Sequence, residues 1–495
     1  MAETSSERRP VSIDDQLVTA ASPARTDLEG MDHARCAALH NYLVEYRMAA
    51  EGLTSVPTSD TLISTLGDAA SAILPRLHPS LAAFFAAART PRFPLFFFAH
   101  GFPDPITTDS WGGLFDNGLA DLHSEPEDCL VRLYHPVIEA GGEDGGLIYH
   151  QRHHVAAFFM HMDDVDFAMP VEEHPLNWHP LETVLSNWIS LIRLGKVVGS
   201  PGETGLYGSE KVGPWEWRSY GEGQVDACIA AWDRLCGAIE ARQSDPDDHE
   251  KHDDGEPLLT PAALDAASIA DPSFARGFLS RARRPSRIRR IAPGLYMPPA
   301  DGATFAAAQP YAHLLRDSSS SIDGTQQHPL VIPPVYIFFS GPYDAPVDVT
   351  GWRSPFRGQL DVASDEEAAR LLPSRVPAGI YTEGVTRGRN LDCAEEGFRL
   401  LLPFAVEGAR KSDGSEVVVR NGDYAGGGSV GDGLFQHGYK PFGGDYYRAQ
   451  RLERLLDHWA GMVERGVWEV GPQGVEGGLG VFRQVTDDYV IPPSW

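Results

Sequence analysis

The sequence predicts an α+β protein in which mixed strands and helices surround one large core or two abutting cores. Three observations predict this class. Long stretches place apolar residues at helical spacing, and shorter apolar runs bounded by Pro or Gly are typical of buried strands. The two kinds of segment follow one another without a regular βαβ alternation, and no repeat of fixed period is visible. Doubly wound sheets, solenoids and propellers are therefore not expected.

The first half of the chain supplies most of the helical patterns. Residues 1–30 are rich in Ser, Thr, Pro and charge, and we expect a flexible N-terminal arm. Pro180 fits the first position of the most regular helix. The helices are expected at 33–50, 59–74, 79–89, 180–195 and 223–241. The strands are expected at 93–99, 129–134 and 147–160.

The segment 244–256 marks the expected boundary between two halves. Seven of its thirteen residues are acidic, and such a run cannot bury itself, so we interpret it as a solvated linker or loop. It separates an N-terminal α+β half, 31–243, from a C-terminal α+β half, 257–495. The second half is expected to hold a strand near the end of 330–340 and a short strand at 417–419. Its helices are expected at 365–373, capped by Ser364 with Glu367, at 393–407, interrupted by Pro403, and at 445–465, ended by Gly466.

Composition and charge narrow the classes of partner. The chain has 495 residues and 42% hydrophobic residues, enough for a large core. With 41 basic and 69 acidic residues its net charge is −28, which repels phosphate backbones and anionic membrane surfaces. Nucleic-acid and membrane partners are therefore not expected, and a small-molecule substrate is. The five cysteines form no CxxC pair and the apolar runs are too short to span a bilayer, which together predict a cytoplasmic protein.

One segment is unusually rich in groups that bind metals. Nine of the eighteen histidines fall between His100 and His179, most densely at 149–167. If 155–161 is an extended strand, His161 and Asp163 lie on one face of it. A His-x-Asp pair supplies two of the three ligands of the facial triad in non-haem iron sites. The pattern predicts a metal site that holds Fe or another divalent ion.

The pattern requires a third ligand, and His179 is the candidate nearest to it in the sequence among those considered. His328, ahead of an apolar strand, and His437, in a Gly-rich loop, are alternatives that the sequence alone does not separate. Asp164 and Asp166 would lie on the opposite face and are expected to act as catalytic acid–base groups. The competing interpretation is structural: these side chains cap the turn into the 180–195 helix and satisfy buried backbone groups.

A second hypothesis assigns magnesium to the acidic cluster at 163–166, with a phosphorylated or diphosphate substrate completing the shell of the ion. Seven arginines lie within the fifteen residues of 276–290, and Arg284 and Arg287 are the expected substrate-binding residues, since arginine pairs with phosphate or carboxylate through two hydrogen bonds. The structural alternative is that these arginines, which we call the arginine island, pair with acidic residues of the same chain.

The function that the sequence favours is a metal-dependent enzyme acting on a small organic molecule. With iron it would be an oxidoreductase, in particular a non-haem iron oxygenase; with magnesium or zinc, a hydrolase or lyase. The alternative from another class is a non-catalytic binding or scaffold protein that uses the acidic segment and the arginine island as contact surfaces.

Overall fold

The computed structural model describes most of the chain between residues 12 and 495. The segments outside the described part are 54–59, 92–93, 104–112, 116–124, 127, 138–144, 204–209, 244–254, 317–318, 321–326, 329, 351–353, 358–359, 361–363, 387–393, 407, 418–431, 445–449 and 485–486. The side chains of 162, 163, 319, 320, 327 and 328 are likewise not described. The expected N-terminal arm is described only from residue 12, and the acidic segment only at its last two residues.

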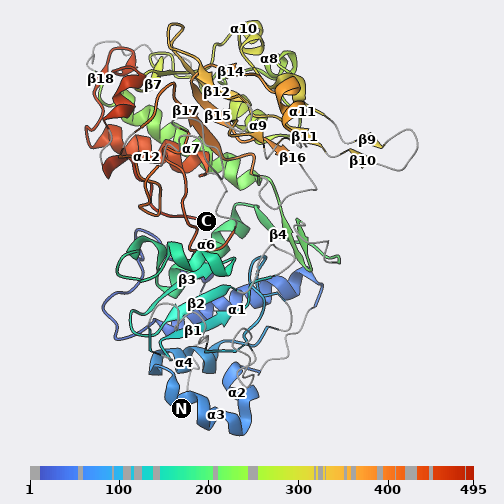
Figure 1. The fold of residues 1–495 in the computed structure, drawn as a ribbon, viewed down its shortest axis with the longest axis vertical. Helices are drawn as coiled ribbons and strands as arrows, with labels where there is room; N and C mark the ends of the chain where they lie inside the picture. Colours follow the sequence, from blue (N-terminus) through green and yellow to red (C-terminus); the bar gives the residue numbers. More distant parts are fainter. Residues whose placement is uncertain are drawn as a thin grey trace, which may run out of the picture.

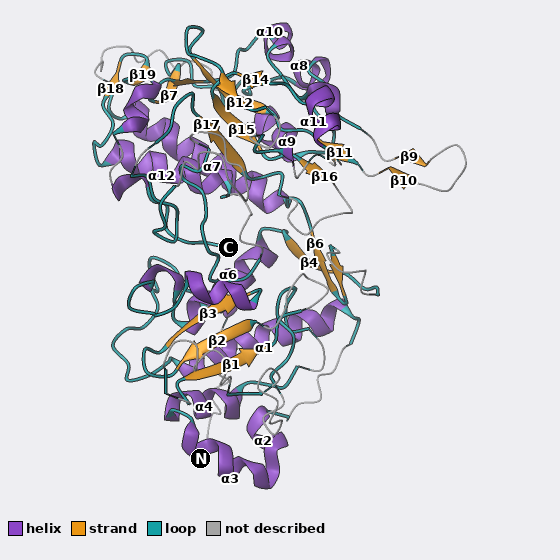
Figure 2. Ribbon diagram, viewed as in Figure 1, coloured by secondary structure: helices purple, strands orange, loops and turns teal. Residues whose placement is uncertain are grey.

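The fold is α+β, as the sequence predicts, and consists of two lobes (Figures 1 and 2). The N-terminal lobe, 12–217, and the C-terminal lobe, which begins at 222, each have their own hydrophobic core, and Phe442 and Trp495 from late in the chain belong to the first core. The second core begins with the apolar face of the helix at 222–240, so this helix packs with the C-terminal residues although it precedes the acidic segment. Apart from Phe442 and Trp495, residues of the first core end along the chain at Trp217, and residues of the second core begin at Val225. The linker at 244–256 stays a prediction, because most of that segment lies outside the described residues.

The N-terminal lobe is built on an antiparallel three-stranded sheet in the order β1-β2-β3. The strands are β1 (Leu130–Tyr134), β2 (Gly146–His150) and β3 (Val155–Phe159). Alternate side chains of these strands enter two different hydrophobic clusters, one on each face of the sheet. The helices of the lobe are α1 (His33–Ala50), α2 (Leu62–Leu66), α3 (Ala70–Ile73), α4 (Pro79–Ala87) and α6 (Leu181–Arg193). A small second sheet joins β4 (Val197–Gly199), β6 (Trp215–Trp217) and β5 (Lys211–Val212).

Two predicted strands of this lobe differ in the structure. The strand expected at 147–160 is a hairpin, because residues 151–154 turn between β2 and β3, with His154 in the left-handed region at φ 57°. The run at 93–99 is described from residue 94, and Leu95–Phe98 are bends in which Phe96 N donates to Ala99 O. Its aromatic side chains are buried as predicted, but the backbone folds back on itself instead of pairing along a sheet.

The C-terminal lobe holds a seven-stranded, mainly antiparallel sheet in the order β17-β15-β12-β8-β7-β19-β18. Its strands are β7 (Arg290–Ala292), β8 (Leu295–Tyr296), β12 (Tyr336–Ser340), β15 (Gly379–Thr382), β17 (Phe398–Leu401), β18 (Val470–Gly471) and β19 (Gly474–Val475). Three pairs of short strands lie outside it: β9 (Ser319–Ser320) with β10 (Gln327–His328), β11 (Val331–Ile332) with β16 (Val385–Thr386), and β13 (Val347–Asp348) with β14 (Arg375–Val376).

Helices α7 (Glu222–Glu240) and α12 (Leu452–Glu464) pack against each other beside the large sheet (Figure 2). Trp232 of α7 stacks on Phe338 of β12 with ring centroids 5.5 Å apart. The shorter helices are α8 (Pro261–Ala266), α9 (Phe274–Arg281), α10 (Gly302–Ala307) and α11 (Asp365–Leu371). The prediction of a helix at 393–407 is wrong. The described part of this segment contains strand β17, most of whose side chains are buried. The strand ends at Leu401, shortly before Pro403, which has no backbone N–H to donate within a sheet.

The two lobes meet at a buried interface that we call the lobe seam. Lys196, which precedes β4, lies with its Nζ 2.9 Å from Glu396 Oε1, and both side chains are 0% exposed. Lys196 Nζ also donates to Ser219 O at 2.8 Å. Residues from late in the chain enter the first lobe here: Trp188 Nε1 donates to Phe442 O at 2.6 Å, and Phe158 N donates to Pro441 O at 2.8 Å. In Figure 1 the C-terminus accordingly lies between the lobes.

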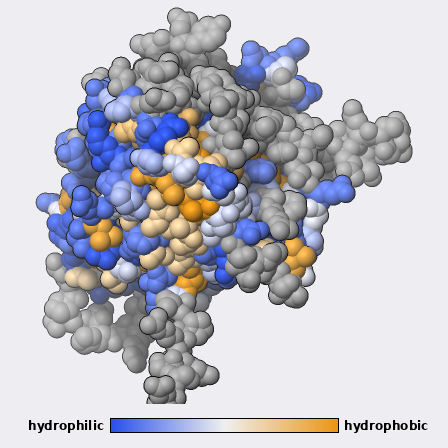
Figure 3. Space-filling model, turned by 90° about the horizontal axis from the view of Figure 1, so that it is seen from below, coloured by the Kyte–Doolittle hydropathy of each residue, from blue (hydrophilic) through white to orange (hydrophobic). Residues whose placement is uncertain are grey.

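The described surface is predominantly hydrophilic on the face shown in Figure 3, with an apolar area near its centre. None of the described helices combines the length and the apolarity that a bilayer crossing requires.

Removing one partner of the ion pair between Lys196 and Glu396 should lower the free energy of unfolding. Lys196→Met leaves Glu396 as a buried, uncompensated charge, so we expect the free energy of unfolding to fall by about 3–5 kcal/mol in urea titrations. The double variant Lys196→Met/Glu396→Gln should recover much of that loss. Arg218→Met, which removes an exposed ion pair with Glu216, is the control and should cost no more than about 1 kcal/mol. Equal losses in the single and double variants would contradict this account.

A second buried ionic group lies in the C-terminal lobe. Arg399 Nε donates to Glu383 Oε1 at 2.7 Å, and Asp432 is buried beside them. Burial, opposed by Arg399 and reinforced by Glu383, raises the pKa of Asp432 from 3.8 to about 6. Between about pH 4 and pH 6, Asp432 therefore keeps its proton in the folded protein and loses it in the unfolded chain.

The resulting pH dependence has a defined sign. Because the folded-state pKa is the higher one, Asp432 costs stability as the pH rises from about 4 through about 6. Asp432→Asn removes this cost, so its free energy of unfolding relative to the parent should increase over that window, by up to about 3 kcal/mol. Urea titrations of both proteins at pH 4, 5, 6 and 7 measure it; a difference that does not change with pH would refute the assignment.

Candidate metal centre

The structure places His161 and Asp163 in a different local geometry from the one predicted. Strand β3 ends at Phe159, and His161 caps the 3₁₀ helix η5 (Met162–Phe167). The alternation on which the His-x-Asp argument depends therefore stops before Asp163, whose side chain lies outside the described part. Asp164 is buried, and its Oδ2 accepts hydrogen bonds from Met160 N at 2.8 Å and His161 N at 3.0 Å. Asp164 thus stabilises the turn.

The other candidates of this segment point elsewhere. His179 pairs with Ala156 through the backbone, and its Nε2 lies 3.1 Å from Leu176 O. Burial lowers the pKa of His179 to about 4, so the ring is neutral at pH 7. Asp166 is exposed. Within the described residues, the group with metal-ligand spacing contains none of these side chains. The roles predicted for His161, Asp163, His179, Asp164 and Asp166 stay predictions.

The arginine island is largely paired within the chain. Arg281 contacts Glu222 and Asp226 of α7, and Arg283 contacts Asp233 and Glu240 of the same helix. The guanidinium of Arg284 donates to backbone oxygens of Leu258 and Pro298. Arg287 is exposed. The island therefore secures the segment 276–290 against α7 and neighbouring loops, and substrate binding by Arg284 and Arg287 remains untested.

A different set of residues comes together at the end of the β1–β2 pair: Glu125, Cys129 and His150. Cys129 directly precedes β1 and His150 ends β2. The register of the two strands pairs Leu130 with His150, which brings the cysteine beside the histidine. Gln151 N donates to Cys129 O at 2.8 Å and fixes this end of the hairpin. These three residues could hold a metal ion, and we call them the metal centre.

The ligand atoms of the metal centre all lie within 4.8 Å of one another. Cys129 Sγ lies 3.5 Å from both ring nitrogens of His150, and His150 Nε2 lies 3.5 Å from Glu125 Oε1. A tetrahedral zinc ion, with bonds of about 2.1 Å to N or O and about 2.3 Å to S, holds its ligands about 3.4–3.6 Å apart and lies on the lone pair of the imidazole nitrogen. Because Sγ is equidistant from both ring nitrogens, the His150 ring has to turn before one ion can bind both residues. The side chains are almost fully buried, with 7% of Glu125 and none of His150 exposed.

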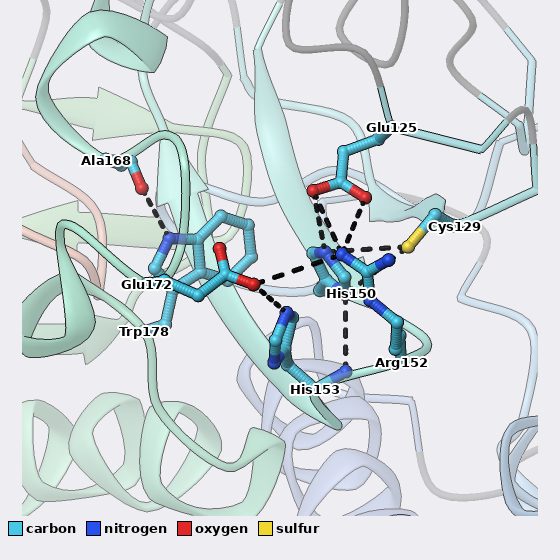
Figure 4. Close-up of polar contacts among 8 residues, drawn as sticks. All are labelled: Glu125, Cys129, His150, Arg152, His153, Ala168, Glu172 and Trp178. Carbon is cyan, nitrogen blue, oxygen red and sulfur yellow. Dashed lines mark hydrogen bonds and ion pairs between the residues drawn. The ribbon is translucent and has the colours of Figure 1, made fainter.

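Polar neighbours surround the metal centre (Figure 4). Arg152 Nη2 donates to both carboxylate oxygens of Glu125, to Oε2 at 3.1 Å and to Oε1, the oxygen that faces His150, at 3.4 Å. His153 N donates to His150 Nδ1 at 3.3 Å, and His153 Nε2 lies 3.0 Å from Glu172 Oε1. This arrangement leaves His150 Nε2 as the nitrogen directed at Glu125. Since Nδ1 accepts a hydrogen bond, the neutral ring carries its proton on Nε2.

The electrostatics do not favour a metal-free Cys–His nucleophile. Burial, and secondarily Glu125, raise the pKa of Cys129 to about 11, while burial and His153 lower the pKa of His150 to about 4. An activated pair shows the opposite shifts, toward thiolate and imidazolium. Moreover, a sulfur equidistant from both ring nitrogens lies off the lone-pair axis of each, where proton transfer is poor. A metal ion would displace the protons from Cys129 and from His150 Nε2.

No family model, no curated protein and no solved structure matches this chain. The chemistry of its side chains therefore carries the functional inference.

Sequence reasoning did not single out Glu125, Cys129 and His150, although Cys129 begins one of the predicted strands, 129–134, and His150 lies within another, 147–160. Twenty-one positions separate the two residues, and no motif of fixed spacing joins them. The available signal was the pairing of the two strands: had the hairpin register been assigned, Cys129 and His150 would have fallen at the same end of one sheet.

The capping role of Asp164 has a direct test. Asp164→Ala leaves two backbone N–H groups, on Met160 and His161, without their acceptor, so we expect a loss of about 1–3 kcal/mol in the free energy of unfolding. Asp164→Asn keeps an acceptor oxygen and should lose clearly less. If both substitutions left thermal stability unchanged, the turn would not depend on this carboxylate.

Proposed function

We propose that the protein is a metal-dependent enzyme acting on a small organic molecule, with a zinc-class divalent ion at Glu125, Cys129 and His150. One observation carries the proposal: three side chains of the three types that bind zinc converge in a buried place, with their ligand atoms within 4.8 Å of one another. Chance proximity on a surface would not bury an imidazole and a thiol against a carboxylate.

The donor set favours zinc over the two metals that the sequence suggested. Magnesium takes oxygen ligands, and a thiolate is too soft for it. The iron facial triad uses two histidines and one carboxylate, whereas this centre has one histidine and a cysteine. A magnesium site would have to involve 163–166 instead. With zinc, the chemistry supplied is that of a Lewis acid, which suits hydrolysis or elimination more than oxidation by oxygen.

The number and accessibility of the ligands favour a catalytic over a structural ion. Structural zinc sites are closed by four protein ligands, mostly Cys and His, and catalytic sites keep three with an exchangeable position. The metal centre has three ligands among the described residues. Arg152 and Glu172 beside it are 55% and 58% exposed, so solvent and small molecules reach its edge. The scaffold alternative has less support, because the arginine island is mostly paired internally.

The test is metal content and affinity of protein purified without a histidine tag or chelator. We expect about one equivalent of zinc, and a weakening of affinity by at least about tenfold in Cys129→Ser and in His150→Gln, measured by competition with a chromophoric chelator. Cys228→Ser is the matched control, since Cys228 is buried in α7, and should bind as the parent does.

Replacement of zinc by cobalt gives a readout that is independent of stability. A thiolate-to-cobalt charge-transfer absorption should be present in the parent and in Cys228→Ser, and absent in Cys129→Ser. Circular dichroism confirms that the variants are folded. A parent that binds no zinc or cobalt, or a Cys129→Ser variant that retains the charge-transfer band, would overturn the proposal.

A further inference from the structure

We propose that Arg287 and Arg289 form a binding surface for an acidic peptide, and that its occupant is the part of the acidic segment at 244–254 of the same chain. The inference does not involve the metal centre. It assigns a partner to the two members of the arginine island that have none among the described residues.

Arg287 and Arg289 differ from the other members of the arginine island. Both are exposed, and neither side chain makes an ion pair or a hydrogen bond with a residue that the structure describes. Their backbone is fixed: Arg287 O accepts a hydrogen bond from Gln243 Nε2 at 3.4 Å, and Arg289 N donates to Gln473 O at 2.9 Å. Ile288 between them is fully buried, so the two arginines occupy the outer side of this stretch.

The acidic groups nearest along this surface already have other arginines as partners. Glu240 pairs with Arg283, and Glu476 pairs with Arg290. The two exposed guanidinium groups therefore keep their positive charge uncompensated within the described part of the chain. In a protein with a net charge of −28, such a surface attracts an anionic segment more strongly than the acidic surface around it does.

The described residues on both sides of the acidic segment contact the arginine island. Before the segment, the side chain of Gln243 donates to the backbone oxygen of Arg287. After it, Arg284 N donates to Glu256 O at 2.8 Å. The chain from 244 to 254 therefore starts and ends beside these arginines.

The sequence of the segment carries the charge that the surface lacks. Residues 244–254 contain six acidic residues and one lysine. The first of the acidic residues, Asp245, is two positions after Gln243, which corresponds to about 7 Å of extended chain. A peptide tethered by so short a connection has an effective concentration on the order of millimolar at the surface. The weak attraction between exposed charges then suffices to favour the contact, because the tether has already removed most of the entropy cost of association.

The contact makes the surface occupied by the chain itself. A separate anion, including a phosphorylated ligand at Arg287, would have to displace the tethered carboxylates. Raising the salt concentration would weaken the contact, because the charges on both sides are exposed to solvent.

The test is the rate at which a glutamate-specific endoprotease cleaves the full-length protein after Glu250, followed by mass spectrometry of the fragments. A bound segment resists cleavage, so we expect Arg287→Gln/Arg289→Gln to be cut at least about threefold faster than the parent at about 20 mM salt, and at the rate of the parent at about 300 mM. Arg370→Gln/Arg375→Gln is the matched control. It removes two other exposed arginines and should be cut at the rate of the parent under both conditions.

Further variants at the same two positions separate charge from packing. Arg287→Lys/Arg289→Lys should retain the protection, and Arg287→Glu/Arg289→Glu should be cut faster than the glutamine variant. Circular dichroism establishes that each variant is folded. Equal cleavage of the parent and the glutamine variant at low salt would overturn the inference, and so would a difference that persists at high salt or a lysine variant that has lost the protection.

Discussion

The ion pair between Lys196 and Glu396 is the interaction on which the architecture depends. Two opposite charges without exposed surface are stable only as long as both are present and hydrogen-bonded, because either alone would be a desolvated charge. Lys196 belongs to the first lobe and Glu396 to the second, so the pair constrains the lobes to one relative position. The rings of Trp217 and Trp495 lie 5.1 Å and 5.3 Å from the ammonium and enclose it with their π faces. The lobe seam is therefore a polar core shared by both halves of the chain.

The lobe seam also supports the sheet that carries the metal centre. Residues 439–442 run along β3, with Phe158 N donating to Pro441 O, and Tyr439 packs in the cluster that contains Leu130 and Ile148. That cluster covers one face of the sheet and includes Trp178. The Trp178 ring contacts the His150 ring edge to face, with ring centroids 6.1 Å apart. The relative position of Cys129 and His150 depends on the register of β1 and β2. Residues 439–442 stabilise the sheet in that register by packing against β3.

Short sequence patterns predicted the helices whose ends are marked by residues next to them in the sequence. The helix that begins after Pro180 has its predicted bounds to within two residues. The helix that ends before Gly466 ends where predicted but begins at Leu452, later than the predicted 445. The strand β17 was mistaken for a helix because a short apolar run fits either period, and its neighbours in the sheet decide the outcome. The metal centre was not predicted because it too depends on contacts between segments that are distant in the sequence. Cys129 and His150 meet through the pairing of β1 with β2, which no residue spacing encodes, whereas the prominent His161-x-Asp163 pattern assumed a strand that ends two residues earlier.

The insertion of late residues into the first lobe has a consequence for biosynthesis. Trp188 and Phe442 are 254 positions apart, and a ribosome that adds about 5–20 residues per second needs on the order of tens of seconds to make the intervening chain. During that time the edge of β3 and the indole N–H of Trp188 lack their final partners. Until residue 442 has been made, the first lobe lacks part of its core, and its aromatic interior is the surface most exposed to association with other chains.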